Sequence, residues 1–323
     1  MTEYSDRVYL EDAGCDTEIT ETRSLLDHLG APQMGQTPVS STVQALELGL
    51  RLRERREQLG LTAAAVGKQT GIGGNNMSSI EIAKRKLTAT KLQELAKVYE
   101  LSDEELDELE VLRAQAERRE WWDDYARLYS EEFLRFIGLE AGASIVREYA
   151  AETIPGLLQT ADYARAMIRG GSPYIKPVDV GPRVESRLAR QGRLDDPDPV
   201  DLTVVIGQTA LRQEVGSREI MAHQLARLAK LSEERREHVK IHVMPYSAGA
   251  HPVIGGGLKI LSFNSQWLPD MVWQEAVTTG SLIDRPHVVR ELSASFDEAA
   301  DRALDLDASL EIIHQVRKEM ETR

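Results

Sequence analysis

The stretch from residue 61 to residue 81, LTAAAVGKQTGIGGNNMSSIE, predicts two short helices joined by a tight turn. The Thr62 side chain can accept a hydrogen bond from a backbone amide of the next turn, so it can cap a helix over 63–70. Gly71 can adopt the left-handed backbone conformation that ends this helix and redirects the chain. A second helix is then expected over about 73–82.

The residues of this stretch separate into an apolar set and a polar set. We expect the apolar set and one small residue to form the contact between the two helices: Val66, Ile72, Met77 and Ile80 in the shared core, and Ala65 where the helices approach closely. The second helix then presents small and polar residues on its outward side: Gly74, Asn75, Asn76, Ser78 and Ser79.

Helix, glycine turn, helix and polar face, in this order, resemble the helix-turn-helix of the Cro/CI-type (XRE) repressors. The resemblance implies that the second helix enters the major groove of DNA, where Asn can bond adenine and Ser can bond several bases. It therefore implies base contacts by Gly74, Asn75, Asn76, Ser78 and Ser79. This chain departs from the usual family residues at four positions: Ala63 for Gln, Gly73 for Ser or Thr, Ala83 for Gly, and Leu87 for Pro. With fewer polar DNA contacts, we expect modest affinity per subunit and reliance on dimerisation.

A basic loop, Lys84-Arg85-Lys86, follows the second predicted helix. Adjacent cations suit the phosphates of the DNA backbone, which supply affinity rather than sequence choice. The start of the preceding helix, at Thr62 and Ala63, directs backbone amide donors outward and is a second phosphate site. We therefore expect Thr62, Ala63 and the three basic residues to hold phosphates. The alternative is a plain helical bundle with a solvated basic face.

The net charge of −14 at pH 7 argues against a nucleic-acid partner only when it is averaged over the chain. Residues 44–99 carry ten basic and five acidic side chains, whereas residues 1–43 and residues 100–118 each carry eight acids and two bases. One basic block thus lies between two acidic ones, which favours nucleic-acid contact within residues 44–99.

A length of 323 residues suggests about two domains. We expect a disordered acidic leader (1–42), a helix-turn-helix DNA-binding domain (43–100), a linker helix (101–120) and a regulatory or partner-binding domain (121–323). The predicted fold class is α+β: an all-α, lambda-repressor-like N-terminal domain, then a larger mixed α/β domain with a small, largely antiparallel sheet. In the second domain, helices are expected at 122–137, 159–169, 181–192, 216–231 and 297–320, and strands at 145–149, 201–206, 239–244, 257–263 and 270–275.

A second resemblance covers the C-terminal part of the chain. Glu148-Tyr149, the string IPGLLQT over 154–160, and Tyr163-Ala164-Arg165 resemble a hallmark of the actinobacterial Scr1-like regulators, which join a Cro/CI-like head to a C-terminal DUF5753 domain. With the head, the resemblance spans about residues 44–320. It implies an antitoxin-like transcriptional regulator that is often encoded beside a small DUF397-type partner protein. Gln208 stands where that family tends to carry Glu.

Four residues of this hallmark combine a carboxylate with hydrogen-bond donors and are candidates for a partner or ligand groove: Glu148, Gln159, Tyr163 and Arg165. The structural alternative is that Tyr163 packs in the core and Glu148 pairs with a basic residue at the domain surface. The histidines fit no zinc spacing, the Gly255–Gly257 run lacks a phosphate-loop frame, and the single cysteine, Cys15, has no neighbouring base. We therefore expect no catalytic residue, no metal site and no cofactor.

The function that these patterns favour is a sequence-specific DNA-binding transcriptional regulator whose C-terminal domain mediates partner, ligand or dimer contacts. We expect it to be cytoplasmic, because the sequence lacks a signal-peptide pattern and an apolar run of about 20 residues. We expect it to bind double-stranded DNA as a homodimer, since two-fold symmetry is usual for this motif. The alternative is an antitoxin-like protein-binding module that acts mainly through a small partner protein, with DNA binding secondary. An enzyme in the C-terminal domain is the least favoured hypothesis.

Overall fold

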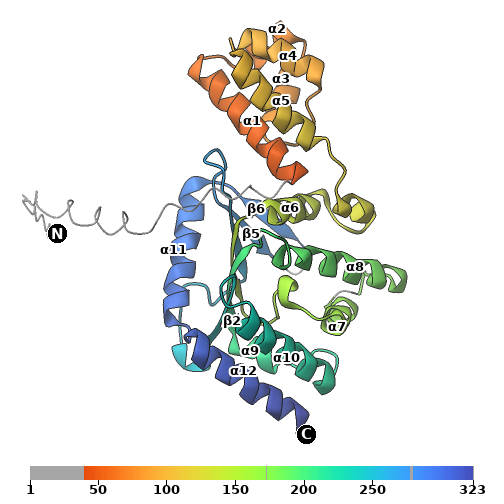
Figure 1. Ribbon diagram of the computed structural model, residues 1–323, viewed down its shortest axis with the longest axis vertical. Helices are drawn as coiled ribbons and strands as arrows, with labels where there is room; N and C mark the ends of the chain where they lie inside the picture. The colour runs from red at the N-terminus through yellow and green to blue at the C-terminus, as the bar shows by residue number, and fades with distance from the viewer. Residues whose placement is uncertain (1–39, 172, 277–278, 323) are drawn as a thin grey trace, which may run out of the picture. The chain divides into compact units, whose positions relative to one another are not determined.

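The computed structural model describes residues 40–171, 173–276 and 279–322 (Figure 1). The predictions for residues 1–39, Cys15 included, lie outside the described residues. At the end of the expected leader, Ser40 already precedes a helix that begins at Ser41. Within the described ranges, no helix combines the length and apolar character needed to cross a membrane.

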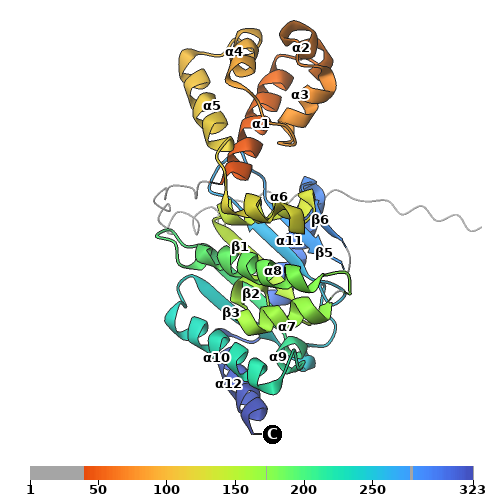
Figure 2. The same cartoon turned by 90° about the vertical axis from the view of Figure 1, so that its right-hand side faces the viewer.

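Five helices form the N-terminal head: α1 (Ser41–Gln58), α2 (Ala63–Thr70), α3 (Gly74–Glu81), α4 (Ala89–Val98) and α5 (Asp103–Ala116) (Figure 2). Polar caps start three of them: Thr62 and Thr88 accept hydrogen bonds at α2 and α4, and Ser102 forms a capping box with Glu105 at α5. The predicted linker helix corresponds to α5, whose Leu109 and Leu112 pack in the same core as α1 to α4.

The rest of the chain is built on a six-stranded sheet in the order β3-β2-β1-β4-β5-β6. The strands are β1 (Ile145–Ala150), β2 (Asp201–Gly207), β3 (Val239–Met244), β4 (Leu258–Ser262), β5 (Met271–Glu275) and β6 (Gly280–Ile283). β1, β2 and β3 are parallel, whereas β1-β4-β5-β6 is antiparallel. The predicted α+β class is confirmed. The sheet was expected to be largely antiparallel but is mixed, because β1, β2 and β3 run parallel. It is also larger than expected, because it includes the short strand β6, which the sequence pattern did not predict.

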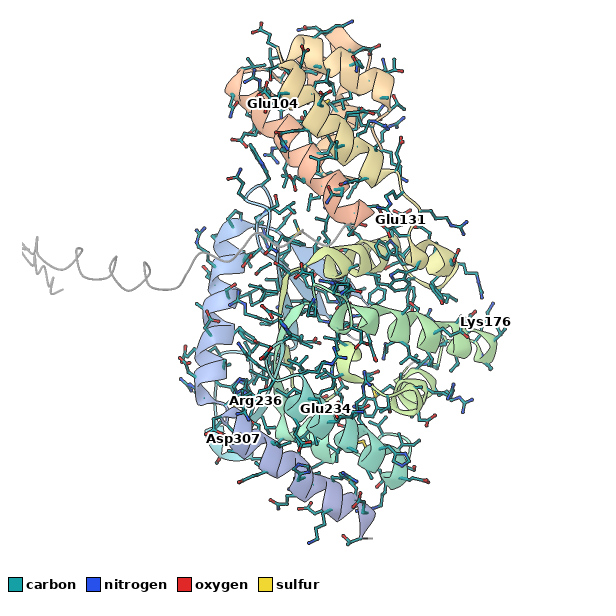
Figure 3. The ribbon with its side chains drawn as sticks, in the orientation of Figure 1. Glu104, Glu131, Lys176, Glu234, Arg236 and Asp307 are labelled. Carbon is teal, nitrogen blue, oxygen red and sulfur yellow. The ribbon has the colours of Figure 1, made fainter. Side chains whose placement is uncertain are left out.

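Helices cover both faces of the sheet (Figure 1). One face shares a hydrophobic core with three helices: α6 (Glu131–Gly142), α10 (Arg218–Glu234) and α12 (Leu306–Glu321). The helices α7 (Ala161–Gly171) and α8 (Pro177–Arg190) lie on the same side. The other face packs against α11 (Pro286–Arg302) through Val289, Phe296 and Ala299. An exposed ion pair of 2.7 Å between Arg236 Nη1 and Asp307 Oδ1 ties α12 to the segment before β3 (Figure 3). Short helical turns complete the domain: η1 (Trp121–Leu128), η2 (Gly156–Leu158), η3 (Gln191–Leu194), α9 (Gln208–Arg212) and η4 (Tyr246–Ala248).

Two of the expected long helices are each divided in two. The helix predicted over 122–137 is η1 followed by α6, because the Ser130 side chain accepts the Phe133 amide and starts a new helix. The helix predicted over 297–320 is the end of α11 followed by α12, where the Asp305 side chain accepts the Ala308 amide. In both cases a polar cap inside an amphipathic pattern marks a new beginning.

The helix α1 belongs to two cores. Leu48 and Leu52 lie in the core of the head, whereas Val43 and Leu46 lie in the core that covers the sheet. Two glycines of α6 allow this close approach. A Cβ at Gly138 would lie 2.0 Å from Thr42 Oγ1, and a Cβ at Gly142 would lie 2.5 Å from Val43 Cγ2.

Two hydrogen bonds secure the start of α1 on this surface. Ser40 Oγ donates to the carbonyl oxygen of Gly138 at 2.6 Å, and the Ser41 amide donates to Glu120 Oε1 at 2.8 Å. The first half of α1 is therefore the packed connection between the head and the sheet domain.

Candidate nucleic-acid interface

The turn between α2 and α3 has the geometry that its sequence predicts. Gly71 has φ +66° and ends α2, and Thr62 Oγ1 accepts the Ala65 amide at 3.1 Å. The predicted core residues are all buried: Val66, Ile72, Met77 and Ile80. Two glycines lie at the tight contact between the helices: a Cβ at Gly67 would lie 2.9 Å from the Ile72 carbonyl oxygen, and a Cβ at Gly74 would lie 3.2 Å from Ala64 Cα. Ala65 is half-buried, and its place at the close approach stays a prediction.

A buried ion pair fixes α3 against α1. Arg56 Nε donates to Glu81 Oε1 at 2.6 Å and Arg56 Nη2 donates to Oε2 at 2.9 Å, so the pair is bidentate. Glu81 is only 4% exposed. Arg56 belongs to the basic block of residues 44–99, but Glu81 neutralises its charge inside the head, so this charge is not available to DNA.

The outward side of α3 presents Asn75 and Ser78, both of which are exposed. Among the contacts of the described residues, neither side chain has a hydrogen bond. Ser79 is half-buried and its Oγ donates to the Asn75 carbonyl oxygen at 2.9 Å, so its hydroxyl is already engaged. Gly74 is half-buried at the α2 contact and offers only its backbone. Of the five expected base-contacting residues, Asn75 and Ser78 are therefore the most available.

The basic loop begins at Ala83, which adopts the left-handed conformation with φ +58°. Lys84, Arg85 and Lys86 are exposed. Arg85 Nη1 donates to Asn76 Oδ1 at 3.0 Å, so Asn76, expected to contact bases, also orients an expected phosphate-binding side chain. The loop thus places three cations beside the exposed side of α3.

The second expected phosphate site is the start of α2. Thr62 is exposed and Ala63 is half-buried. The Thr62 hydroxyl oxygen caps its own helix by accepting the Ala65 amide. What remains for a phosphate there is the set of backbone amides in the first turn of α2.

The four candidate residues of the C-terminal domain do not form one group in the fold. Tyr163 is fully buried and its hydroxyl oxygen accepts the Ile154 amide at 3.1 Å. Gln159, also buried, donates to the Ile154 carbonyl oxygen at 2.7 Å and accepts a hydrogen bond from Arg187. These two side chains hold the turn that begins at Ile154. Arg165 pairs with Asp162 at 3.1 Å on the exposed side of α7.

Glu148 belongs to a different group, a buried charge cluster beneath α6. Lys259 Nζ lies 2.7 Å from Glu140 Oε2 and 3.0 Å from Glu148 Oε2, and Arg190 binds Glu140 through two hydrogen bonds of 2.6 and 2.9 Å. Burial opposes the ionisation of Glu140, but Arg190 and Lys259 outweigh burial and lower its pKa to about 2. Burial raises the pKa of Glu148 above its usual range, and Lys259 offsets this only in part.

The cluster places Glu148 against a basic residue, but in the interior rather than at the domain surface. The other members of the cluster, Glu140, Arg190 and Lys259, could not be predicted as partners because they are far apart in the chain. In the part of the chain that the structure describes, no group of three or more His, Cys, Asp and Glu side chains could hold a metal ion.

Comparison with protein families decides what this architecture is. A model for a helix-turn-helix domain matches residues 47–109, and the model for a domain of unknown function, DUF5753, matches residues 133–315. The second match covers more than half of the 323 residues. The chain belongs to the DUF5753 family. The expected head and C-terminal domain of this DUF5753 protein are thereby confirmed, and the Scr1-like subfamily remains a prediction.

The helix-turn-helix match indicates that this DUF5753 protein is a DNA-binding regulator. Comparison with curated proteins found no match, and comparison with solved structures found none either. The matching family model describes a domain of unknown function, so the role of this domain has to be inferred from its own residues.

Proposed function

We propose that this DUF5753 protein is a sequence-specific transcriptional regulator that contacts bases through α3. The observation that carries the proposal is the pair Asn75 and Ser78, exposed on the helix after the glycine turn and without a hydrogen bond among the described contacts. An exposed Asn at this place can make a bidentate contact with adenine in the major groove. The C-terminal domain acts by binding a partner, a ligand or a second copy, and not by catalysis.

The two kinds of DNA contact predict different variants. Asn75→Ala is expected to weaken binding to the preferred site by about 1–3 kcal/mol and to leave binding to random DNA unchanged. Lys86→Ala is expected to weaken binding to all sequences and to reduce the salt dependence, the slope of log affinity against log salt concentration, by about 0.9. Equal losses on preferred and random DNA for Asn75→Ala would remove the base-contacting role.

We further propose that the regulator works as a homodimer. The contact residues are few, and a dimer of this motif contacts two half-sites about one helical turn apart. A small DUF397-type protein is the expected partner of the C-terminal domain, in line with the Scr1-like resemblance, and the cytoplasm is the expected location.

The test is capture of genomic DNA fragments by the full-length protein. The control variants are Asn75→Ala and Gln93→Ala, since Gln93 is an exposed amide on α4 without a hydrogen bond among the described contacts. We expect a few palindromic sites to be enriched by the wild type and by Gln93→Ala, but not by Asn75→Ala. Enrichment of no site would contradict the proposal and favour the antitoxin-like, protein-binding alternative.

A further inference from the structure

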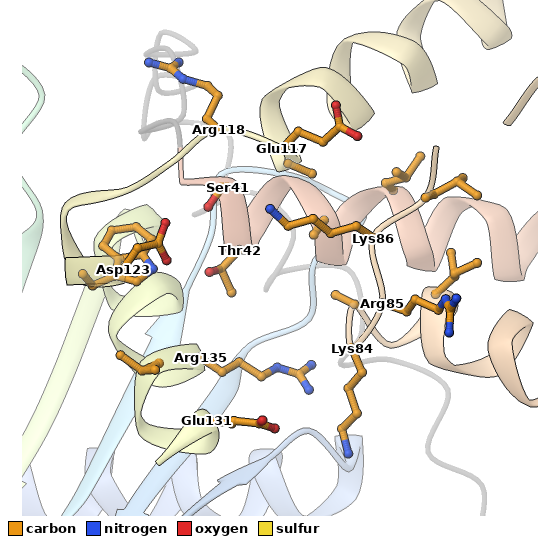
Figure 4. A pocket seen from close by; sticks show the side chains of 18 of the residues that line it. Ser41, Thr42, Lys84, Arg85, Lys86, Glu117, Arg118, Asp123, Glu131 and Arg135 are labelled. Carbon is orange, nitrogen blue, oxygen red and sulfur yellow. The ribbon is translucent and has the colours of Figure 1, made fainter. Parts of the chain in front are cut away.

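A cavity of about 1110 Å³ lies where the basic loop of the head faces the sheet domain (Figure 4). Ligand pockets in proteins typically measure about 300–1,000 Å³, so its size is sufficient for a small molecule. Its lining includes Lys84, Arg85 and Lys86 from the loop, Thr42 from α1, and Glu131 and Arg135 from α6. The loop that is proposed to hold DNA phosphates therefore also forms one wall of this cavity.

Several charged groups of the cavity are already neutralised or hydrogen-bonded. Arg113 pairs with Glu110 and Glu117 at the end of α5. Glu132 Oε1 accepts the Leu282 amide of β6 at 3.2 Å. In the same way, Asp123 accepts the Glu120 amide and Arg85 donates to Asn76. These groups are committed to the fold.

The remaining charges leave a positive surplus. Among the contacts of the described residues, four lining cations have no side-chain hydrogen bond or ion pair: Lys84, Lys86, Arg118 and Arg135. Only two lining carboxylates are in the same situation, Glu131 and Asp284. Arg85, Asp123 and Glu132 keep their charges, because their hydrogen-bond partners are neutral amide groups. Apart from the Arg113–Glu117 ion pair, five lining cations therefore face four lining carboxylates, which leaves one net positive charge.

Arg135 is the most informative of these cations. It lies in the second turn of α6, is half-buried, and extends with Glu131 toward Lys84 (Figure 4). Burial lowers the pKa of Arg135, and the charges of Asp284 and Glu132 only partly oppose this. A half-buried guanidinium without an ion pair among the described contacts is a costly arrangement that a bound anion would relieve. Ser41 and Thr42 of α1 also line the cavity, and their hydroxyl groups can donate to such an anion.

We propose that this cavity binds a small phosphorylated ligand whose phosphate group lies between Arg135 of the sheet domain and Lys84 of the head. A phosphate suits this site because Arg offers it a planar, bidentate donor pair and Lys adds a point charge. The ligand and DNA then compete for the basic loop. This competition rests on the proposed function, whereas binding of the ligand itself does not. By linkage, the ligand releases DNA to the same extent that DNA weakens ligand binding.

The first test is calorimetric titration of the full-length protein with sodium tripolyphosphate at constant ionic strength and without divalent cations. The variants are Arg135→Gln and Lys84→Gln, one from each wall. The matched control is Arg290→Gln, an exposed arginine of α11 that also lacks a side-chain partner among the described contacts. We expect one saturable site per chain, binding about 10-fold weaker in each wall variant, and no change in the control. Wild-type affinity in Arg135→Gln, or equal losses in Arg135→Gln and Arg290→Gln, would overturn the site.

The second test measures binding of a captured DNA fragment in tripolyphosphate or in potassium chloride of equal ionic strength. Tripolyphosphate should weaken DNA binding of the wild type more than the chloride does, and Arg135→Gln should lose this difference while binding DNA normally without the anion. If Arg135→Gln alone weakens DNA binding as much as Lys84→Gln, the cation serves DNA phosphates and the proposal is overturned. If the anion site is present but no DNA fragment is captured, the ligand site stands and the proposed function fails.

Discussion

The packing of α1 on α6 predicts a specific effect of the substitution Gly138→Ala. The added Cβ would lie 2.0 Å from Thr42 Oγ1 and 2.6 Å from Thr42 Cβ, which is far inside van der Waals contact, so α1 must move away. Inserting a methyl group into a tightly packed contact typically costs about 1–3 kcal/mol. Ala is more favourable than Gly within a helix by about 1 kcal/mol. The measured loss of stability in Gly138→Ala is therefore smaller than the steric cost.

A matched substitution separates the two contributions. Gly170 is also helical, in α7, but a Cβ there would meet no atom within 4 Å. The difference between Gly138→Ala and Gly170→Ala in the free energy of unfolding should therefore be the steric cost alone, about 1–3 kcal/mol. At about 2–4 °C per kcal/mol, this corresponds to a Tm difference of roughly 2–12 °C, with Gly138→Ala the lower.

Two measurements check this prediction. Thermal unfolding of both variants gives the Tm difference, and hydrogen exchange locates it. Gly138→Ala should accelerate exchange in the first two turns of α1, around Val43 and Leu46, and leave residues 52–58 of the same helix unchanged. A Tm for Gly138→Ala equal to or above that of Gly170→Ala would refute the packed connection between head and sheet domain.

Three further predictions concern the buried charges and the loop after α3. Glu140→Gln leaves both buried cations of its cluster without their main anion, so urea unfolding should show a loss of about 3–5 kcal/mol. Because the pKa of Glu140 is lowered from 4.5 to about 2 in the folded state, its contribution is present above pH 4.5 and is lost as the pH falls toward 2. Acid titration of the wild type should show this as a loss of up to about 3 kcal/mol. Ala83→Gly removes a left-handed alanine, φ +58°, and should raise the free energy of unfolding by about 0.5–1 kcal/mol; a decrease would contradict the strain.

The features that sequence predicted best are those with a local cause. The cap at Thr62 and the turn at Gly71 depend on residues within three or four positions of each other, and the structure has both as predicted. The same holds for the capping box of Ser102 with Glu105. Such signals act through backbone hydrogen bonds and left-handed dihedral angles that the sequence determines locally.

The features that sequence missed depend on partners far away in the chain. Gly138 and Gly142, four positions apart, could have indicated a close helix approach, but nothing local identifies α1 as the partner. From the sequence, Lys259 would be expected to face solvent on a strand, but it pairs with Glu140, 119 residues earlier. β6 escaped prediction because its four residues are too few to establish an alternating pattern.

The candidate interface was predicted as a surface but not residue by residue. The outward face of α3 and the basic loop follow from the helical period, so their exposure could be expected. The hydrogen bond from Arg85 to Asn76 could not, because it depends on side-chain geometry across the turn at Ala83. The bond from Ser79 to the Asn75 carbonyl oxygen depends on which rotamer the hydroxyl group adopts within α3. This is why five expected base contacts reduce to two well-placed ones.

The measurement that tests the central claim most directly compares wild type and Asn75→Ala on every single-base-pair variant of one captured site. If Asn75 contacts an adenine, the wild type should discriminate at one A·T pair by about 1–3 kcal/mol, and Asn75→Ala should lose discrimination at that pair alone. Unchanged discrimination at every pair in Asn75→Ala, with affinity lowered uniformly, would contradict the claim that α3 selects the sequence.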